Sequence, residues 1–520
     1  MKTVCKAGTF AAAVAIAASA AAQDNQSTVD QTGEDGTITI DQIGSANVST
    51  IEQAGNEQIA TILQEGDRNS STVLQSANGN RGVIEVSQIG NDNAVVAFHN
   101  TLADWPHGQF PHLVAEQTGE RNQARAFLDD KVESPIVAWA FRGGGWLPFR
   151  HIYQVGDDNE VELVQTGDSD SAQVLQISSY FGKAFITQSG ESGWAQVIQT
   201  GANNHTEILQ DATAESHLAY SQVRSTQTGD DNFADLTQNG HRLNVSGYQE
   251  GDQNHLTVDQ TGERALVDAE QLGDRNRAEL TQILPSGKGQ DLILVQTGSD
   301  NLARADQSAG YTSAQLEQTG SEHRLQVSQR GWELRTFIRQ EGMRNDAVIN
   351  QDADFGETQI LQTGEGQVAQ IDQNPGWSGD YPYPDSNSYL GAERPAKAFV
   401  SQDGANSNAS ITQIASVAYA YIGQEGERHR AVTIQNADSA ASEAWTTQKG
   451  ADNVSAIEQT TTQSTARLEQ DGSELESTIL QTGDQLTALV TQVGAGQVSV
   501  VNQTGSFNSA TVSQGGVPVP

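Results

Sequence analysis

The sequence contains a single cysteine, Cys5, among 520 residues. This cysteine precedes a short apolar run near the N-terminus, whereas a lipoprotein anchor requires a cysteine after such a run. If the N-terminal segment is removed on export, the remaining chain has no thiol, which excludes disulfides and thiol chemistry. Aromatic residues are also scarce at 6%, and hydrophobic residues make up only 36% of the chain. These values would predict disorder in an irregular chain, but internal repetition predicts a shared core instead.

Basic residues are few, because 28 Lys and Arg stand against 66 Asp and Glu, which gives a formal net charge of -38. A chain of this charge repels nucleic acid and anionic membrane surfaces, so we expect no nucleic-acid partner. Long hydrophobic runs are lacking as well. The apolar stretch over residues 9–22 is too short to span a bilayer as a helix, so we expect no transmembrane segment.

The N-terminal segment has the pattern of a signal peptide. Lys2 and Lys6 precede the alanine-rich run, and small residues stand directly before Gln23, as they do at signal-peptide cleavage sites. We therefore predict a signal peptide over residues 1–22 and a mature chain that is secreted and extracellular or attached to the cell surface.

An eleven-residue repeat dominates the rest of the sequence. A glutamine returns at this interval from Gln31 to Gln75, and strict spacing recurs within 227–282, 296–373 and 448–514. An eleven-residue period also occurs in right-handed coiled coils. Glycine follows most of these glutamines by two positions, which is unfavourable within a helix. Apolar and polar residues alternate with a period of two, as they do in strands.

Each repeat predicts one strand and one tight turn. With the glutamine as position zero, positions +5, +7, +9 and +11 share one face; Leu256 and Val258, for example, flank the polar Thr257 in the repeat that starts at Gln249. Glycine at +2 permits positive φ, and Asp or Asn after it favours a turn. Strong and weak repeats mostly alternate, so two repeats form one coil. We predict an all-β fold, a β-solenoid of about 19 two-strand coils with three aromatic-rich loop insertions.

The repeated glutamines are expected to face inward. Buried amides are costly unless they are hydrogen bonded, and stacked glutamines of successive coils can bond along the solenoid axis, as in cross-β stacks. Such a ladder also fixes the register, because a slip of one residue would expose the aliphatic side chains. Ligand binding is the alternative role for these residues. The predicted structural ladder includes Gln31, Gln42, Gln53, Gln64, Gln154, Gln165, Gln227, Gln249, Gln260, Gln271, Gln296, Gln318, Gln340, Gln362, Gln424, Gln448, Gln481, Gln492 and Gln503.

Three longer segments interrupt the ladder and are rich in aromatic residues, which marks them as loops that leave the solenoid. Aromatic loops on a rigid scaffold can bind glycans or protein partners; alternatively, they form small cores against the sheet. The candidate binding residues are Trp105, Trp139, Trp146, Trp377, Tyr381 and Tyr383. The expected organisation is a signal peptide at 1–22, eleven-residue repeats at 23–97, insertions with one repeat at 98–153, repeats at 154–373, a Pro/Tyr-rich insertion at 374–401, and repeats with a C-terminal tail at 402–520.

The residue pattern does not predict catalysis. The histidines of the first insertion lack tight zinc-ligand spacing, and the triple glycine at 143–145 is not followed by the Lys-Ser/Thr of a phosphate loop. The acidic turns lack the glycine doublet of calcium-binding β-solenoids. We therefore expect no enzyme and no catalytic, cofactor-binding or metal-binding residues.

The pattern Q-x-G-x-x-N, followed after five residues by another Q, resembles the curlin repeat of curli subunits. Gln154 begins one clear example, Q-V-G-D-D-N, and Gln227 another, Q-T-G-D-D-N; the resemblance covers most of residues 31–514. It implies a subunit or minor component of extracellular amyloid fibres in cell adhesion and biofilm. It also implies self-association or association with other curlin-like subunits, passage through outer-membrane secretion machinery, and contact with host or environmental surfaces.

Two functional hypotheses stay open. The first is a fibre protein, as an unusual subunit or a nucleator. The second is a monomeric β-solenoid adhesin that binds glycans or partners through its aromatic loops. Ice binding is disfavoured because the outward positions mix acidic, basic, amide and threonine side chains. Both remaining hypotheses need the same coil, so the ends of the solenoid decide between them.

Overall fold

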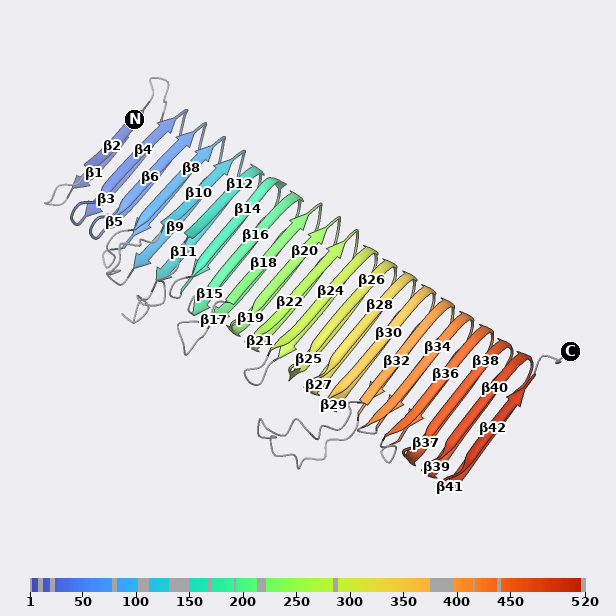
Figure 1. Cartoon of the computed structure of the whole chain (residues 1–520). Coiled ribbons are helices and arrows are strands. Elements are labelled where there is room, and N and C mark those ends of the chain that lie inside the picture. Colours follow the sequence, from blue (N-terminus) through green and yellow to red (C-terminus); the bar gives the residue numbers. More distant parts are fainter. Residues whose placement is uncertain are drawn as a thin grey trace, which may run out of the picture. The chain divides into compact units, whose positions relative to one another are not determined.

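The computed structural model describes residues 2–7, 13–18, 24–76, 82–101, 112–130, 149–166, 170–190, 193–212, 221–283, 289–374, 396–414, 417–436 and 441–515. These residues form strands joined by turns, and no helix occurs among them. The chain divides into two units, Met1–Arg264 and Ala265–Pro520. In each unit, odd-numbered strands pair with one another and even-numbered strands pair with one another (Figure 1). The predicted all-β solenoid is thus confirmed.

Unit 1 contains the strands that run from the N-terminus to the middle of the chain. They are β1 (Lys2–Ala7), β2 (Ala13–Ala18), β3 (Gln26–Thr32), β4 (Thr37–Ile43), β5 (Val48–Ala54), β6 (Ile59–Glu65), β7 (Ser70–Gln75), β8 (Val83–Ile89), β9 (Ala94–Thr101), β10 (His112–Thr118), β11 (Gln123–Asp130), β12 (Phe149–Asp157), β13 (Glu160–Gln165), β14 (Ser171–Tyr180), β15 (Lys183–Gly190), β16 (Gly193–Ala202), β17 (His205–Ala212), β18 (Ser221–Thr228), β19 (Phe233–His241), β20 (Asn244–Glu250) and β21 (His255–Glu263).

Unit 2 contains the remaining strands. They are β22 (Ala265–Leu272), β23 (Arg277–Ile283), β24 (Gln290–Ser299), β25 (Leu302–Gly310), β26 (Ser313–Ser321), β27 (Arg324–Trp332), β28 (Arg335–Met343), β29 (Asp346–Asp354), β30 (Gly356–Glu365), β31 (Val368–Gln373), β32 (Ala396–Ala405), β33 (Asn408–Gln413), β34 (Ala418–Glu427), β35 (Arg430–Gln435), β36 (Ser442–Ala451), β37 (Val454–Thr462), β38 (Thr465–Ser473), β39 (Glu476–Asp484), β40 (Thr487–Ala495), β41 (Val498–Ser506) and β42 (Ser509–Gln514).

The pairing within each sheet is parallel and in register. In unit 1, Gln31 on β3 lies beside Gln53 on β5. In unit 2, Gln296, Gln318 and Gln340 lie side by side on β24, β26 and β28. Two consecutive strands therefore make one coil, and corresponding sequence positions stack on one another in successive coils, apart from a register shift in β14 next to Gln176.

Strand residues alternate between the core and solvent. Leu256 and Val258 on β21 are buried, whereas the residues between and beside them are not. Near the end of unit 2 the core cluster joins both sheets through residues such as Ile457 and Leu468. Each coil contributes only a few aliphatic side chains, so its stability depends on the coils stacked against it.

The turns explain why glycine recurs at position +2. Gly342 has φ of +110°, and a Cβ atom added there would lie 2.0 Å from the carbonyl oxygen of Gly364 in the next coil. A side chain at this position would therefore collide with the backbone of its neighbour. Position +4 also takes positive φ but is usually not glycine, as at Asn203 and Asp231, and residues of these two types tolerate this conformation best.

The solenoid continues further into the expected insertions than the repeat pattern suggested. Strands β9 to β12 cover parts of 98–153, and β32 begins within 374–401. The physical reason is substitution within the ladder: His99 and Leu128 occupy the column between Gln75 and Gln165. A search for regularly spaced glutamines therefore ended before the coils did.

The N-terminal segment also adds strands to unit 1. β1 pairs with β3, which places Ala7 beside Gln31, and β2 pairs with β4, which places Ala18 beside Gln42. The segment predicted to be a signal peptide thus covers the first coil of repeats. Its removal at Gln23 stays a prediction.

Candidate functional site

The central feature is a ladder of side-chain amides inside each unit. In unit 1, Gln42 Nε2 donates a hydrogen bond to Gln64 Oε1 at 2.8 Å, and Gln64 Nε2 donates to Gln88 Oε1 at 2.9 Å. In unit 2, Gln318 donates to Gln340 at 2.9 Å in the same way. The donor always belongs to the coil nearer the N-terminus. The ladder therefore has a direction, with amide nitrogens pointing toward the C-terminal coils.

The structure places every ladder glutamine named above in the interior, with at most 6% of its surface exposed. Many of these amides make a second bond to the opposite sheet. Gln64 Nε2, for example, also donates to the carbonyl oxygen of Val48 at 3.2 Å. Bonds in both directions satisfy most of the polar atoms that burial would otherwise leave unpaired. The ladder therefore holds the two sheets together as well as the coils.

Hydroxyl side chains extend the ladder in a way that the sequence analysis missed. Ser49 Oγ accepts from Gln42 at 3.1 Å and donates to Gln64 at 3.0 Å. In unit 2, Thr336 Oγ1 accepts from Gln329 at 3.0 Å and donates to Gln351 at 2.8 Å. Both hydroxyls stand at position +7, where the repeat that starts at Gln249 has Leu256. A small hydroxyl residue in an apolar column is the signal that could have identified them.

One core position carries an arginine. Arg150 occupies a column otherwise filled by residues such as Leu113 and Ala172, and only 1% of its surface is exposed. Its Nε donates a hydrogen bond to Gln165 Oε1 across the interior. The amide ladder can therefore accept a charged donor where the repeat pattern predicts an aliphatic residue.

Asparagines form a second ladder at the inner corner, at position +5. Asn47 Nδ2 donates to the carbonyl oxygen of Gly66 in the next coil at 2.8 Å, and Asn47 Oδ1 accepts the backbone N–H of Asn69 at 2.9 Å. Asn47 is fully buried. These bonds bind the turn of one coil to the next and explain why asparagine is preferred there.

Charged pairs connect neighbouring turns on the outside. Arg68 and Asp92 make two hydrogen bonds, at 2.7 and 2.6 Å, and Arg121 pairs with Asp158 in the same geometry. The hydrogen bond from Arg68 lowers the pKa of the Asp92 carboxyl, and that from Arg121 lowers the pKa of Asp158. The pairs are solvent-exposed, so they contribute little to stability. Such exposed ion pairs are typical of a solvated protein surface.

Unit 1 has a column of rings on the outward face of its odd-numbered strands. The ring centroids of His205 and Phe233 are 5.1 Å apart, and those of Phe233 and His255 are 4.7 Å apart. Partial burial in this column lowers the pKa of His205, although Glu207 opposes the shift. Cross-strand ring contacts of this kind stabilise a sheet.

A second group of rings lies on the even-numbered strands of unit 2. Tyr419 stacks on Trp445 with centroids 4.7 Å apart, and Tyr421 lies 5.3 Å from Trp445. A Cβ atom added at Gly423 would lie 2.8 Å from the hydroxyl oxygen of Tyr421, so the ring covers this glycine. We name Phe399, Tyr419, Tyr421 and Trp445 the aromatic face.

The aromatic residues expected to form binding loops are not among those that the structure describes. They are Trp105, Trp139, Trp146, Trp377, Tyr381 and Tyr383. A role in binding stays a prediction for all six, and the aromatic face is a separate feature that the sequence analysis did not identify.

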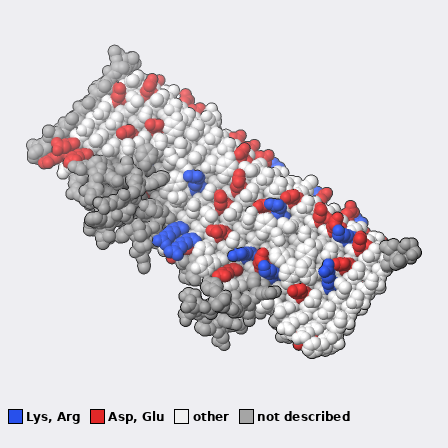
Figure 2. Space-filling view, in the orientation of Figure 1, with Lys and Arg blue, Asp and Glu red and all other residues white. Residues whose placement is uncertain are grey.

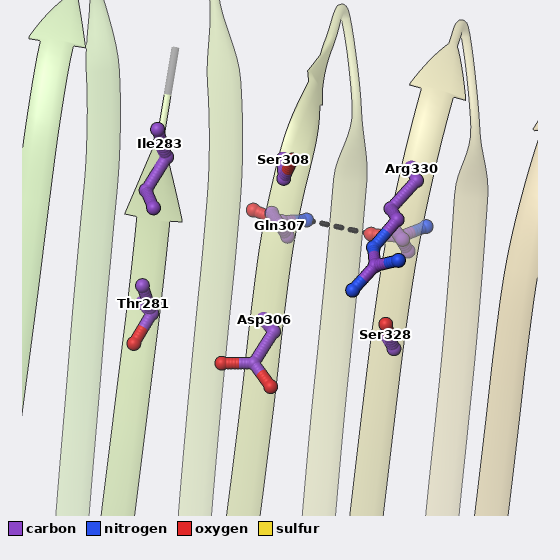
Figure 3. A pocket seen from close by; sticks show the side chains of 8 residues that line it. Thr281, Ile283, Asp306, Gln307, Ser308, Ser328 and Arg330 are labelled. Carbon is purple, nitrogen blue, oxygen red and sulfur yellow. Dashed lines mark hydrogen bonds between the residues drawn. The ribbon is translucent and has the colours of Figure 1, made fainter.

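A hollow on the surface of unit 2 lies over three neighbouring strands of one sheet. Figure 3 shows it between outward side chains of β23, β25 and β27, with the Gln307–Gln329 hydrogen bond of 2.7 Å at its floor. Asp306 and Arg330 supply its charges, and its other lining residues are small or polar, apart from Ile283. Two serines, Ser308 and Ser328, are among its lining residues, and no histidine is among them.

Among the described residues, no three His, Cys, Asp or Glu side chains are placed to hold a metal ion. None of the described segments forms a helix of the length and hydropathy needed to cross a membrane.

The last coil of unit 2 has an open edge. Within the described residues, β41 pairs only with β39 and β42 only with β40. Val500 is 68% exposed and Phe507 is 75% exposed. No charged residue follows Asp484 in the sequence, and the surface near the C-terminal end in Figure 2 is largely uncoloured.

In the first coil of repeats in unit 1, the side-chain oxygen of Gln31 is an acceptor without a donor. Gln31 Nε2 donates to Gln53 Oε1 at 2.7 Å, but Gln31 Oε1 has no hydrogen-bond partner although it is buried. At the other terminus, Gln503 and Gln514 donate only to backbone oxygens of the opposite sheet, each at 2.9 Å. Gln31 in unit 1 thus lacks a donor, and Gln503 and Gln514 in unit 2 lack a glutamine acceptor.

Comparison with known proteins gives one family. The model of the curlin associated repeat matches residues 229–262, 298–331 and 462–494. Each matched segment contains three successive ladder glutamines. The family match therefore covers strands and turns that carry the amide ladder. A search of curated proteins found no match to the chain.

Proposed function

Curlin associated repeats form three segments of this chain, and from that premise we propose that it is a secreted structural protein that associates end to end in curli-like extracellular fibres. Such fibres support cell adhesion and the biofilm matrix. The partner in this proposal is a second copy of the chain or another curlin-like subunit, which the outer-membrane secretion machinery exports.

The observation that carries the proposal is the complementarity of the two ladder ends. A second copy placed beyond β41 and β42 would bring its Gln31 Oε1 within reach of a Gln503 amide that has no glutamine to follow it. Its backbone would also pair with the open strands, because an unpaired strand edge is a template for another chain. The same positions would then continue to stack across the junction.

The distribution of charge also supports end-to-end association through the terminal coil. The protein carries a formal net charge of -38, yet the 36 residues after Asp484 include no Asp, Glu, Lys or Arg. Like charges oppose contact between the outward faces. The terminal coil lacks this opposition, and it exposes apolar side chains such as Val498 and Val500.

A first experiment follows the purified chain that begins at Gln23, by electron microscopy and thioflavin fluorescence. We expect fibres and a rise in fluorescence. A chain that stays monomeric at high concentration would contradict the proposal.

A second experiment blocks the open edge. The N–H groups of Glu476 and Thr487 donate to the next coil at 2.8 and 2.9 Å, and their counterparts Val498 and Ser509 point to the open edge. Proline is tolerated as the first residue of a strand but cannot donate this bond. We expect Val498→Pro with Ser509→Pro to slow fibre growth at least tenfold.

The matched control replaces both residues by threonine, which keeps the N–H groups. Unchanged growth of the proline variant would exclude this edge as the junction. Slow growth of both variants would assign the effect to the side chains instead.

The aromatic face favours a second function, that of a monomeric adhesin. Tyr421 and Trp445 are half-buried on an outward sheet surface, where rings can stack on the apolar faces of sugars. Binding of the monomer to a glycan array, lost in Tyr421→Ser with Trp445→Ser, would support this alternative. Fibre formation without glycan binding would favour the first proposal.

A further inference from the structure

Two coils of unit 2 carry histidine at the inner corner, where asparagine is the usual residue. His323 stands between Asn301 and Asn345 in the corner ladder, and its backbone N–H donates to Asn301 Oδ1 at 3.1 Å. His429 stands in the same way before Asn453. Both imidazoles are buried, with at most 1% of the residue exposed.

The imidazole of His323 reproduces the hydrogen bonds of the asparagine amide. Asn345 Nδ2 donates at 3.0 Å to the carbonyl oxygen of Glu341, four residues earlier, and Asn345 Oδ1 accepts the N–H of Gln367 at 3.0 Å. His323 Nε2 lies 3.1 Å from the carbonyl oxygen of Thr319, also four residues earlier. His323 Nδ1 accepts the N–H of Asn345 at 3.3 Å.

His429 has the same arrangement in a different coil. Its Nε2 lies 3.1 Å from the carbonyl oxygen of Glu425, and its Nδ1 accepts the N–H of Asn453 at 3.4 Å. A carbonyl oxygen only accepts and a backbone N–H only donates. Both sites therefore require a neutral imidazole with its proton on Nε2.

We propose that His323 and His429 are acid-sensitive rungs of unit 2, which close the corner when neutral and open it when protonated. Protonation adds a hydrogen to Nδ1, so the nitrogen that accepted the N–H of Asn345 or Asn453 becomes a donor facing a donor. The corner loses a hydrogen bond and gains a buried charge, which is costly without a partner. Asparagine at the same position makes equivalent bonds and cannot be protonated in this range.

The surroundings of His323 favour the neutral form. Burial lowers the pKa of His323, and the carbonyl groups of Thr319 and Gly342 oppose this shift more weakly. The charged residues beside it on its own turn are Glu322 and Arg324, and those on the adjacent coils are Asp300, Arg344 and Asp346. Asp346 is half-buried; burial raises the pKa of its carboxyl, and Arg324 opposes that shift. The other four are exposed.

His429 has charged groups nearer to it. Burial again has the largest effect and lowers its pKa; the carbonyl of Glu425 and the carboxylate of Asp452 raise it, and Arg428 lowers it. Arg428 and Asp452 form an ion pair at 2.8 Å outside the corner. Because the two side chains carry opposite charges, they shift the pKa of His429 in opposite directions.

The direction of the pH effect follows from these shifts. Histidine in an unfolded chain has a pKa of about 6.5, and both native values are lower, so the open or unfolded state binds protons first. Stability is therefore complete above about pH 6.5 and falls as the pH decreases. The equilibrium between closed and open corners changes by up to about tenfold per pH unit for each histidine.

The test uses hydrogen exchange of the full chain between pH 8 and 5, corrected for the intrinsic rate. We expect the amides of Asn345 and Asn453 to lose protection as the pH falls, whereas amides at corners with asparagine keep theirs. The double variant His323→Asn with His429→Asn should keep protection at both sites. His241→Asn, which changes an outward histidine beside Glu263, is the matched control and should behave like the wild type.

Equal acid sensitivity in the wild type and the double asparagine variant would overturn the proposal. If the variant does not fold, ¹⁵N-histidine NMR of the wild type decides. Two buried imidazoles with the proton on Nε2 at pH 8, which become protonated only as protection is lost, are expected. The opposite tautomer, or protonation without loss of protection, would disprove the acid-sensitive rung.

Discussion

At the scale of the residue, the glutamine ladder turns a polar interior into a stabilising one. A lone buried amide would be unfavourable, but Gln64 takes part in hydrogen bonds with Gln42, Gln88, Ser49 and a backbone carbonyl at once. The contribution of Gln64 to stability therefore depends on the residues stacked above and below it. The same residue placed in a coil without counterparts above and below would lose most of these bonds.

Replacing Gln64 with leucine tests this dependence. The change removes the acceptor of Gln42 Nε2 and the donor to Gln88 Oε1. Gln42 Nε2 keeps its bond to Ser49, and Gln88 Oε1 keeps the bond from Ser71. The variant therefore loses several hydrogen bonds worth about 0.5–1.5 kcal/mol each, and we expect a clear decrease in the midpoint of denaturant unfolding and faster hydrogen exchange in β4, β6 and β8.

The control is Glu65→Ala, which changes the exposed neighbour of Gln64 and should alter stability by no more than about 0.5 kcal/mol. If both variants unfold at the same denaturant concentration, the amide ladder does not stabilise the fold.

At the scale of the strand and the coil, much could be predicted from the sequence because the period of the pattern equals the period of the structure. An eleven-residue spacing with alternating polarity permits one strand and one turn, and the +2 glycine identifies the turn. Burial of Leu256 and Val258 follows directly from that alternation.

The positions that the repeat pattern failed to predict share a physical cause, which is substitution within a stacked column. His99 and Leu128 replace glutamine in the ladder column, and Ser49 replaces an aliphatic residue at +7. Each stands in register with its counterparts because the strands on both sides pair with its backbone. The pairing of Tyr421 with Gly423 depends on side-chain conformation on one strand, and a repeat pattern contains no information on it.

The equivalence of coils predicts that one can be removed. Thr465 on β38 stacks on Thr487 on β40, so deletion of residues 465–486 joins the chain at equivalent positions. We expect the shortened protein to keep the β-rich circular dichroism spectrum, with hydrogen exchange in β22 to β34 unchanged, because each coil contacts mainly its neighbours.

A deletion of residues 465–485 is the matched control. It is one residue shorter, so the strands that follow would turn their apolar side chains to solvent. We expect loss of protection from β40 to the end of unit 2. Equal protection there in both deletions would show that register is not set by the repeat.

At the scale of the whole molecule, the N-terminal segment controls the proposed association. β1 and β2 pair with β3 and β4, which are the strands that would receive the terminal coil of another copy. The edge with the free acceptor of Gln31 is therefore covered while residues 2–18 are attached.

Comparing two purified forms of the chain tests this control. The form that begins at Met1 should assemble with a longer lag in thioflavin fluorescence than the form that begins at Gln23, because the added strands must first leave the edge. Equal lag times would mean that β1 and β2 do not protect this edge. Mass spectrometry of the protein exported from cells tests separately whether cleavage occurs before Gln23.

The uneven distribution of charge also has a consequence for the material that such a chain would form. A particle with charged faces and a neutral terminal coil behaves as a colloid with few attractive patches. Such particles associate end to end, while the repulsion between their charged faces opposes side-by-side bundling. The repulsion acts over a Debye length of about 10 Å at 0.1 M salt and about 3 Å at 1 M. The ionic strength of the surroundings would then decide whether a matrix of separate threads or one of thick cables is formed, with no change in the protein itself.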